Sequence, residues 1–221
     1  MSASGSFPID LVLFGMIAAF LVLRLRSVLG KRTGYERPEQ PIRRDITGAP
    51  VIEGQAEPVA PPRPARPLPD PASPLGETLL RMQGIDRGFD PTRFLDGAEA
   101  AFRLIVTAFA AGDRVSLRNL LSDDTYRAFE SAIAAREAAD ETQRTEVRAI
   151  AAATIEGADL RGTLADVVVR FVSDQVNLTL GRDGQPVTGT DAVTEIVDLW
   201  TFERDLSTRD PTWRLAAARS A

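Results

Sequence analysis

The side chains that could do chemistry in this 221-residue chain are mainly carboxylates and arginines, because the sequence contains no histidine and no cysteine. These absences exclude serine–histidine triads, thiolate nucleophiles, and imidazole or thiolate metal sites. Four charged residues fall on segments that we predict to be strands: Asp166, Arg170, Asp198 and Arg204. Strand alternation places Asp166 and Arg170 on one face.

An Asp–Arg–Asp arrangement of these residues could activate water in a hydrolase or an isomerase. The same four residues also fit structural ion pairs. We favour the structural interpretation, and we expect no catalytic residue, no metal site and no cofactor in this protein.

Aromatic residues give a second candidate site. Phe102, Trp200, Phe202 and Trp213 could line a pocket for a lipid or a small apolar ligand. Such aromatic residues are more often part of the core, and we favour that interpretation. The segment 192–205 carries apolar residues on both faces, which is typical of a central strand covered on both sides or of a sheet wrapped around a cavity.

Helical spacing of apolar residues predicts the elements that precede Thr145. A short helix over 75–83 should end at Gly84. A second helix should begin at Asp90, with Pro91 in its first turn, and continue for about four turns.

The second helix should end at Gly112, and two further helices should follow. Asp113 and Ser122 are suitable N-caps for them. Arg136 and Asp140 lie four residues apart near the end of the last helix and could pair on its solvent side.

From Thr145 onward the apolar period shortens to two, which predicts strands. We expect them at about 145–156, 162–173, 175–182, 192–205 and 212–218, with turns at 157–162, Ser173–Asp174, 181–184 and 209–211. Short connections imply an antiparallel meander. The predicted fold is therefore α+β, with three to four helices packed on one face of a curved sheet of four to five strands.

Residues 7–26 are predicted to form a transmembrane anchor. Residues 7–25 would span roughly 28 Å as a helix, close to the ~30 Å hydrocarbon core. Positive charge follows the apolar run and does not precede it, which argues against a cleaved signal peptide and predicts an N-terminus outside the membrane. The flanking basic residues set this topology and could also contact anionic lipid; they are Arg24, Arg26, Lys31 and Arg32.

Residues 27–74 are predicted to be a basic juxtamembrane segment followed by a disordered, proline-rich linker. Eleven of the fifteen prolines lie between Pro38 and Pro74, a composition typical of extended polyproline-II chain. The run from Pro61 to Pro69 contains P-x-x-P spacing, which can serve as an interaction motif, although a spacer needs no partner.

Net charge excludes one class of partner. Residues 1–44 carry seven Lys or Arg against three acidic residues, and the total of −5 leaves −9 on the rest of the chain. An acidic folded portion argues against nucleic acid, because phosphate neutralisation supplies most non-specific affinity.

Four segments resemble a known family: FLDGAEAAFRLIVTAFAAGD (94–113), LLSDDTYRAFESAIAARE (120–137), VRFVSDQV (169–176) and DLWTFERDLSTRDPTWRL (198–215). They are similar to the C-terminal domain of Tim forty-four, the mitochondrial import-motor subunit, and most similar to its α-proteobacterial relatives. The likeness covers about residues 76–217. It implies a cone-shaped fold akin to nuclear-transport-factor-two domains and a non-catalytic adaptor at a membrane.

In mitochondria this family recruits a chaperone of the seventy-kilodalton class and touches anionic lipid. The resemblance therefore implies, as partners, the inner membrane, anionic lipid and an unidentified protein such as a chaperone or a membrane-protein assembly factor. We expect a single-pass protein of the bacterial inner membrane, with domain 75–221 in the cytoplasm.

Overall fold

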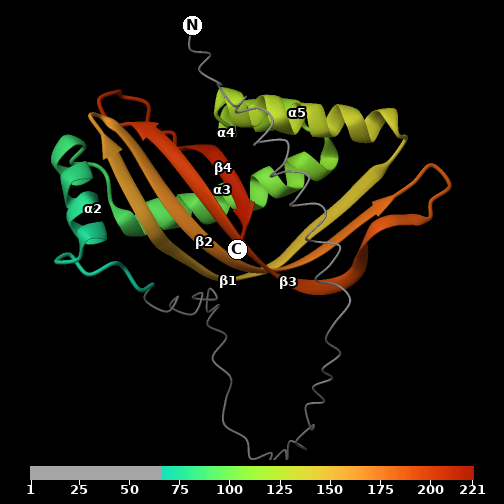
Figure 1. The fold of residues 1–221 in the computed structure, drawn as a ribbon, viewed down its shortest axis with the longest axis horizontal. Helices are drawn as coiled ribbons and strands as arrows, with labels where there is room; N and C mark the ends of the chain where they lie inside the picture. Colours follow the sequence, from blue (N-terminus) through green and yellow to red (C-terminus); the bar gives the residue numbers. More distant parts are fainter. Residues whose placement is uncertain (1–65) are drawn as a thin grey trace, which may run out of the picture.

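The computed structural model describes residues 66–221, so the predicted anchor and most of the linker lie outside it. Helices come first and strands follow, as predicted for an α+β fold (Figure 1). The elements are α2 (Pro74–Ile85), α3 (Pro91–Ala111), α4 (Arg114–Leu120), α5 (Asp123–Ala138), β1 (Thr142–Arg161), β2 (Leu164–Leu180), β3 (Pro186–Asp205) and β4 (Arg214–Ser220).

The helix boundaries follow from their capping residues. Asp90 accepts a 2.8 Å hydrogen bond from the backbone N–H of Arg93, and Asp113 and Ser122 cap α4 and α5 in the same way. Gly112 has a φ of +70° and ends α3 in the left-handed conformation that favours glycine. The prediction for Gly84 is wrong: its backbone stays helical, and α2 continues to Ile85.

The strands form one antiparallel sheet in the order β1-β2-β3-β4. The predicted turn at Ser173–Asp174 is wrong, because β2 runs straight through it and merges two of the expected strands. Ser173 is fully buried and accepts a 2.9 Å hydrogen bond from the Gln175 side chain. Ser173 and Asp174 are turn-forming residue types, but they lie within a strand because the sheet pairs both of them with β1 and β3.

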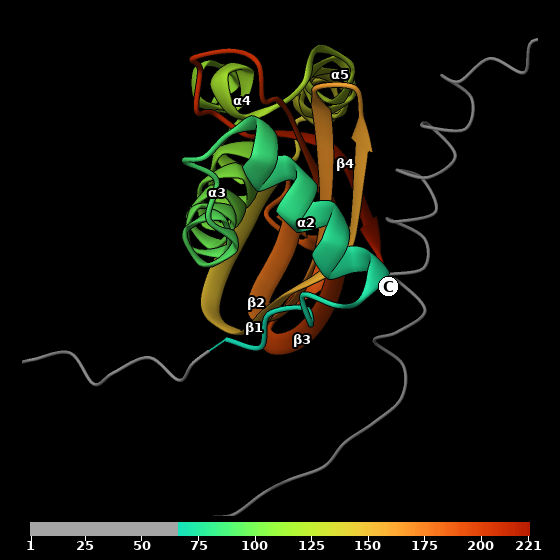
Figure 2. The ribbon, with the colours of Figure 1, turned by 90° about the vertical axis from the view of Figure 1, so that its left-hand side faces the viewer.

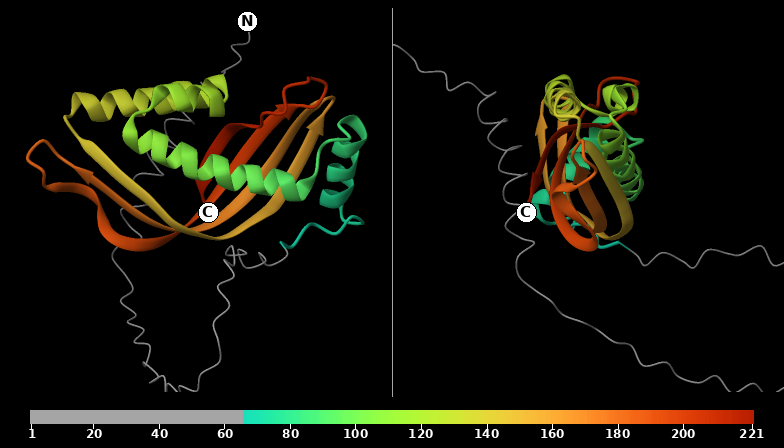
Figure 3. Two further views of the ribbon diagram at one scale, coloured as in Figure 1. Left: turned by 180° about the vertical axis from the view of Figure 1, so that it is seen from behind. Right: turned by 90° about the vertical axis from the view of Figure 1, so that its right-hand side faces the viewer.

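Irregular pairing bends the sheet. The register of β1 against β2 shifts at three places, between Val147 and Ala149, between Ile150 and Ala152, and between Ile155 and Gly157. Each such bulge bends a strand and increases its twist. The sheet is accordingly curved, α3 lies across its concave side, and α4 and α5 lie above α3 (Figures 1 and 3).

The core lies between α3 and the concave face of the sheet. Phe102 of α3 is fully buried, with its ring centroid 4.6 Å from those of both Phe171 and Trp200. β2 contributes alternate buried residues, including Val167 and Val169. α2 covers one end of this sandwich, beside β1 (Figure 2).

Candidate functional site

The four charged residues singled out in the sequence do not converge. Asp166 and Arg170 alternate with the buried Val167 and Val169, so they lie on the convex face. Asp166 pairs there with Arg161, and Arg170 lies 3.4 Å from Glu156.

Asp198 and Arg204 lie on the opposite, concave face. Asp198 is paired in register with the core residue Phe171, and Arg204 follows the core residue Phe202 at the strand spacing of two. Since two of the four side chains lie on each face, they form no Asp–Arg–Asp centre. No cluster of metal-ligating side chains occurs within residues 66–221 either.

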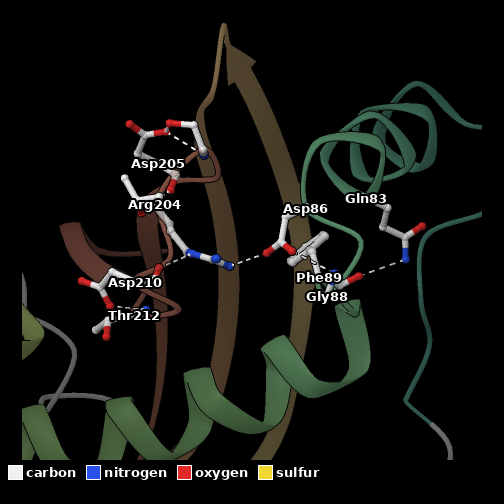
Figure 4. A network of polar contacts seen from close by, with 10 residues as sticks. Gln83, Asp86, Gly88, Phe89, Arg204, Asp205, Asp210 and Thr212 are labelled. Atoms are coloured by element: carbon white, nitrogen blue, oxygen red, sulfur yellow. Dashed lines mark hydrogen bonds and ion pairs between the residues drawn. The ribbon is translucent and has the colours of Figure 1, made fainter.

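Arg204 instead joins two loops at one end of the sheet (Figure 4). Its Nη1 lies 2.9 Å from Oδ2 of Asp86, in the α2–α3 loop, and its Nε donates a 2.9 Å hydrogen bond to the carbonyl of Asp210, in the β3–β4 loop. Its side chain is only 10% exposed. A charge-assisted contact of this kind in a partly desolvated place is stronger than one at the surface.

Local hydrogen bonds hold each of these loops in shape. Asp86 accepts a 2.8 Å bond from the backbone N–H of Gly88, and Gln83 donates a 3.2 Å bond to the carbonyl of Phe89. Thr212 donates hydrogen bonds to the Asp210 carboxylate, and these lower the pKa of Asp210. The two loops therefore form a defined rim.

A groove of about 460 Å³ opens between this rim and the N-terminal half of α3. Four aromatic residues form its wall, and we call it the aromatic groove: Phe89, Phe94, Phe202 and Trp213. The Trp213 ring lies 4.9 Å from Phe94 and 5.6 Å from Phe89, between centroids. Trp213 is half-buried and presents part of its ring to the groove, whereas the other three are buried beneath it.

The predicted pocket residues divide between the groove and the core. Phe202 and Trp213 line the groove, whereas Phe102 and Trp200 are packed against Phe171 in the core and do not line it. Sequence reasoning missed Phe89 and Phe94. Their position on either side of the Asp90–Pro91 helix start was the available signal, because an apolar residue before an N-cap often packs against the fourth helical residue, and the two ring centroids lie 6.1 Å apart.

A second polar feature lies at the other end of the sheet and centres on Arg136. The predicted pair with Asp140 is wrong, because Arg136 turns inward and donates hydrogen bonds to the carbonyls of Phe109 (2.9 Å) and Ala110 (3.1 Å). It thereby satisfies the last carbonyls of α3, and burial lowers its pKa. Asp140 pairs instead with Arg182 in the β2–β3 hairpin.

From Arg136 a row of side-chain hydrogen bonds continues along β1 and β2; we call it the polar row. It comprises Arg136, Gln143, Thr145, Asn177, Gln175 and Ser173. The bond from Thr145 to Asn177 measures 2.7 Å and links the two strands. Because its members form hydrogen bonds with one another, we interpret the polar row as a structural element and not as a ligand site.

The four basic residues predicted to touch lipid lie outside the described part of the chain. Between residues 66 and 221, none of the helices has both the length and the apolar character needed to cross a bilayer.

Comparisons with known proteins complete the description. No curated protein matches the sequence. Among solved structures, the intermembrane-space region of the chloroplast protein ARC6 aligns with a TM-score of 0.44 and 11% identity, over 60% of this chain and 99% of that chain. A putative dehydratase of the NTF2-like family from Streptomyces avermitilis aligns with a TM-score of 0.32 and 12% identity, over 58% of this chain and 95% of that one.

The family model described as the Tim44-like domain matches residues 75–220, which is well over half of the chain. This is the family that the segments between residues 76 and 217 resemble. The chain therefore belongs to the Tim44-like domain family, a family of membrane-associated protein-interaction domains.

Proposed function

We propose that this protein is a membrane-anchored, non-catalytic adaptor that holds a protein partner at the cytoplasmic face of the bacterial inner membrane through its aromatic groove. The observation that carries the proposal is the lining of the groove. Among residues 66–221, the charged residues that line it are Asp90, Arg93 and Arg204. Asp90 caps α3 and Arg204 is held by Asp86, so neither is arranged for proton transfer. An apolar groove without an acid–base pair suits binding better than chemistry.

Membership of the Tim44-like domain family supports the membrane location. The predicted anchor at 7–26 supplies the attachment, and Arg24, Arg26, Lys31 and Arg32 contact the anionic inner surface. A chaperone or a membrane-protein assembly factor is the class of partner that the family resemblance implies.

The orientation can be tested by cysteine labelling, since the chain has no native cysteine. We expect Ser4→Cys to react with a membrane-impermeant maleimide on intact spheroplasts, and Thr188→Cys, on the exposed β2–β3 hairpin, to react only after lysis. The reverse pattern would overturn the topology.

The role of the groove can be tested by photo-crosslinking in membranes. Leu104 lines the groove and is 49% exposed, and Val187 on the β2–β3 hairpin is 51% exposed, so the two positions are matched in accessibility. A photoreactive residue at Leu104 should give a discrete protein adduct that Val187 does not give. Equal yields from both positions, or none from Leu104, would contradict a groove-bound partner.

A lipid or a small apolar ligand is the second candidate, because the groove volume falls within the ~300–1,000 Å³ range of small-ligand sites. Mass spectrometry of the Leu104 adduct separates the two candidates. A lipid mass on the photoreactive residue supports the second, and a protein mass supports the adaptor.

A further inference from the structure

The end of the proline-rich linker is fixed to α3. Arg66 lies 3.0 Å from the Asp96 carboxylate through Nη1 and 2.9 Å from the Glu99 carboxylate through Nη2. Its side chain is only 15% exposed. Opposite charges attract more strongly when they are largely out of water, so the two ion pairs hold Arg66 on α3 even though its buried Nη1 makes no hydrogen bond within residues 66–221. We call this contact the Arg66 clamp.

Next to the clamp, the exposed surface of α3 carries two small residues. Gly97 and Ala100 lie one and four residues after Asp96. A glycine inside a helix costs about 1 kcal/mol relative to alanine, yet no atom lies within 4 Å of where a Cβ of Gly97 would be. Nothing in residues 66–221 therefore uses the space at Gly97, which would let a chain cross the helix closely.

Gly97 and Ala100 also line the aromatic groove. The clamp and the groove thus lie on adjacent faces of the same two turns of α3. The Gly97–Ala100 surface therefore borders both the carboxylates that hold Arg66 and the groove that Trp213 lines.

The chemistry of the groove suits a proline-rich chain. Polyproline-II segments dock into aromatic-lined grooves and lose little entropy because they are already extended. Residues 58–65 contain four prolines at Pro58, Pro61, Pro62 and Pro64. At ~3.1 Å per residue, eight residues reach about 25 Å, which exceeds the ~10–12 Å diameter of a helix.

We propose that residues 58–65 fold back across α3 and occupy the aromatic groove of their own chain. This inference deepens the proposed function, because a partner must then displace the segment. A short tether gives an effective concentration in the millimolar range, so even a weak intramolecular contact is populated. The linker is in this view a competitor for the groove as well as a spacer.

The experiment uses the full chain in nanodiscs without any partner, so that its outcome does not depend on the adaptor proposal. Trp200→Phe leaves Trp213 as the only tryptophan. In this background Pro61, Pro62 and Pro64 are replaced by glycine. The matched control replaces Pro38, Pro41 and Pro50. The readout is acrylamide quenching of Trp213 fluorescence.

We expect the quenching constant of Trp213 to rise about twofold in the Pro61/Pro62/Pro64 variant and to stay unchanged in the control, because only the first loses its preformed extended segment. Arg66→Ala should give a smaller rise in the same direction. A synthetic peptide of residues 56–67 should restore protection to the first variant.

Three outcomes would overturn the proposal. Equal quenching in the test and control variants would show that the linker does not cover Trp213. Protection that disappears on dilution of the nanodiscs would assign the segment to a second copy of the chain. Protection of Trp213 that follows the lipid composition in both variants would assign the groove to lipid.

Discussion

The two ends of the curved sheet are built from different side chains. At the groove end, where α2 and the β3–β4 loop meet α3, Phe202 of the concave face packs against Phe94 of α3, which also packs against Trp213 of the β3–β4 loop. At the hairpin end, beyond Ser173, the same face carries the polar row that begins at Arg136. The change occurs along β2, between the core residue Phe171 and Ser173.

This difference shows that one strand can bury its inner face in two ways. Apolar burial at the groove end contributes most of the stability, because its energy scales with the area removed from water. The polar row is close to neutral when complete and costly when broken, because a buried group then loses its partner. The groove end should thus set overall stability, and the hairpin end should respond chiefly to loss of specific bonds.

The largest expected effect comes from the core beneath the groove end. Phe102→Ala removes a fully buried ring and should lower the free energy of unfolding by about 3–5 kcal/mol. Val193→Ala, on a hairpin-end residue that is 56% exposed, should change it by no more than about 0.5 kcal/mol. Urea unfolding of the full chain in detergent micelles, followed by tryptophan fluorescence, measures both. Comparable losses in the two variants would remove the distinction between the ends.

The next effect tests the polar row. Arg136→Met keeps most of the side-chain stem but leaves the carbonyls of Phe109 and Ala110 without these donors, and it should cost about 2 kcal/mol. Arg144→Met is the matched control on β1, since Arg144 is 66% exposed and lies 3.8 Å from Glu146; it should cost about 0–1 kcal/mol. The same unfolding measurement applies. Equal stability of the two variants would show that the polar row does not contribute to folding stability.

A smaller effect is expected from the ion pair at the groove rim. Asp86→Asn retains an acceptor for Gly88 but removes the charge opposite Arg204, and should cost roughly 1 kcal/mol because Asp86 is 23% exposed. Hydrogen exchange should quicken for α2 amides and stay constant in the β2–β3 hairpin. Asp183→Asn, which keeps the acceptor for Gln185 in that hairpin, should leave α2 unchanged. Faster exchange of amides in both α2 and the β2–β3 hairpin would show that the ion pair does not act only at the groove rim.

The smallest effect concerns the convex face behind the groove end. Burial, and then the neighbouring Asp166, raise the pKa of Glu203 above its ordinary 4.5. The folded state therefore binds the carboxyl proton of Glu203 more tightly than the unfolded state does. The stability that this proton contributes is fully present below pH 4.5 and is lost as the pH rises through the raised pKa. Glu203→Gln should raise stability at pH 7 by roughly 0.5 kcal/mol at most, and this gain should shrink toward pH 4. Thermal unfolding at pH 7 and at pH 4 tests this prediction. A larger stability gain at pH 4 than at pH 7 would contradict a raised pKa of Glu203.

Much of the fold could be predicted from local signals. The caps at Asp90, Asp113 and Ser122 set three helix starts through bonds to amides three residues away. The order of helices and strands predicted the α+β class. Ser173–Asp174 was misread because turn propensity is local, whereas the bonds of Ser173 and Gln175 come from the folded sheet.

The candidate site was less predictable. Alternation along β2 correctly placed Asp166 and Arg170 on one face, but it could not show that Asp198 and Arg204 lie on the other. Arg136 was expected to face solvent, because a helical spacing of four identifies a neighbour without showing whether a third element offers better acceptors. The groove itself joins residues more than 100 positions apart, such as Phe94 and Trp213.

The sequence by itself determined which side-chain chemistry is absent and to which family the chain belongs. It also determined where the helices start and that helices precede strands. Composition, capping residues and linear motifs are properties of the chain itself. Only the tertiary structure decided which charges meet, which aromatics line a groove and which are core, and that Arg66 is held on α3. These depend on strand register and helix packing, because they arise from contacts between elements that are distant in the chain.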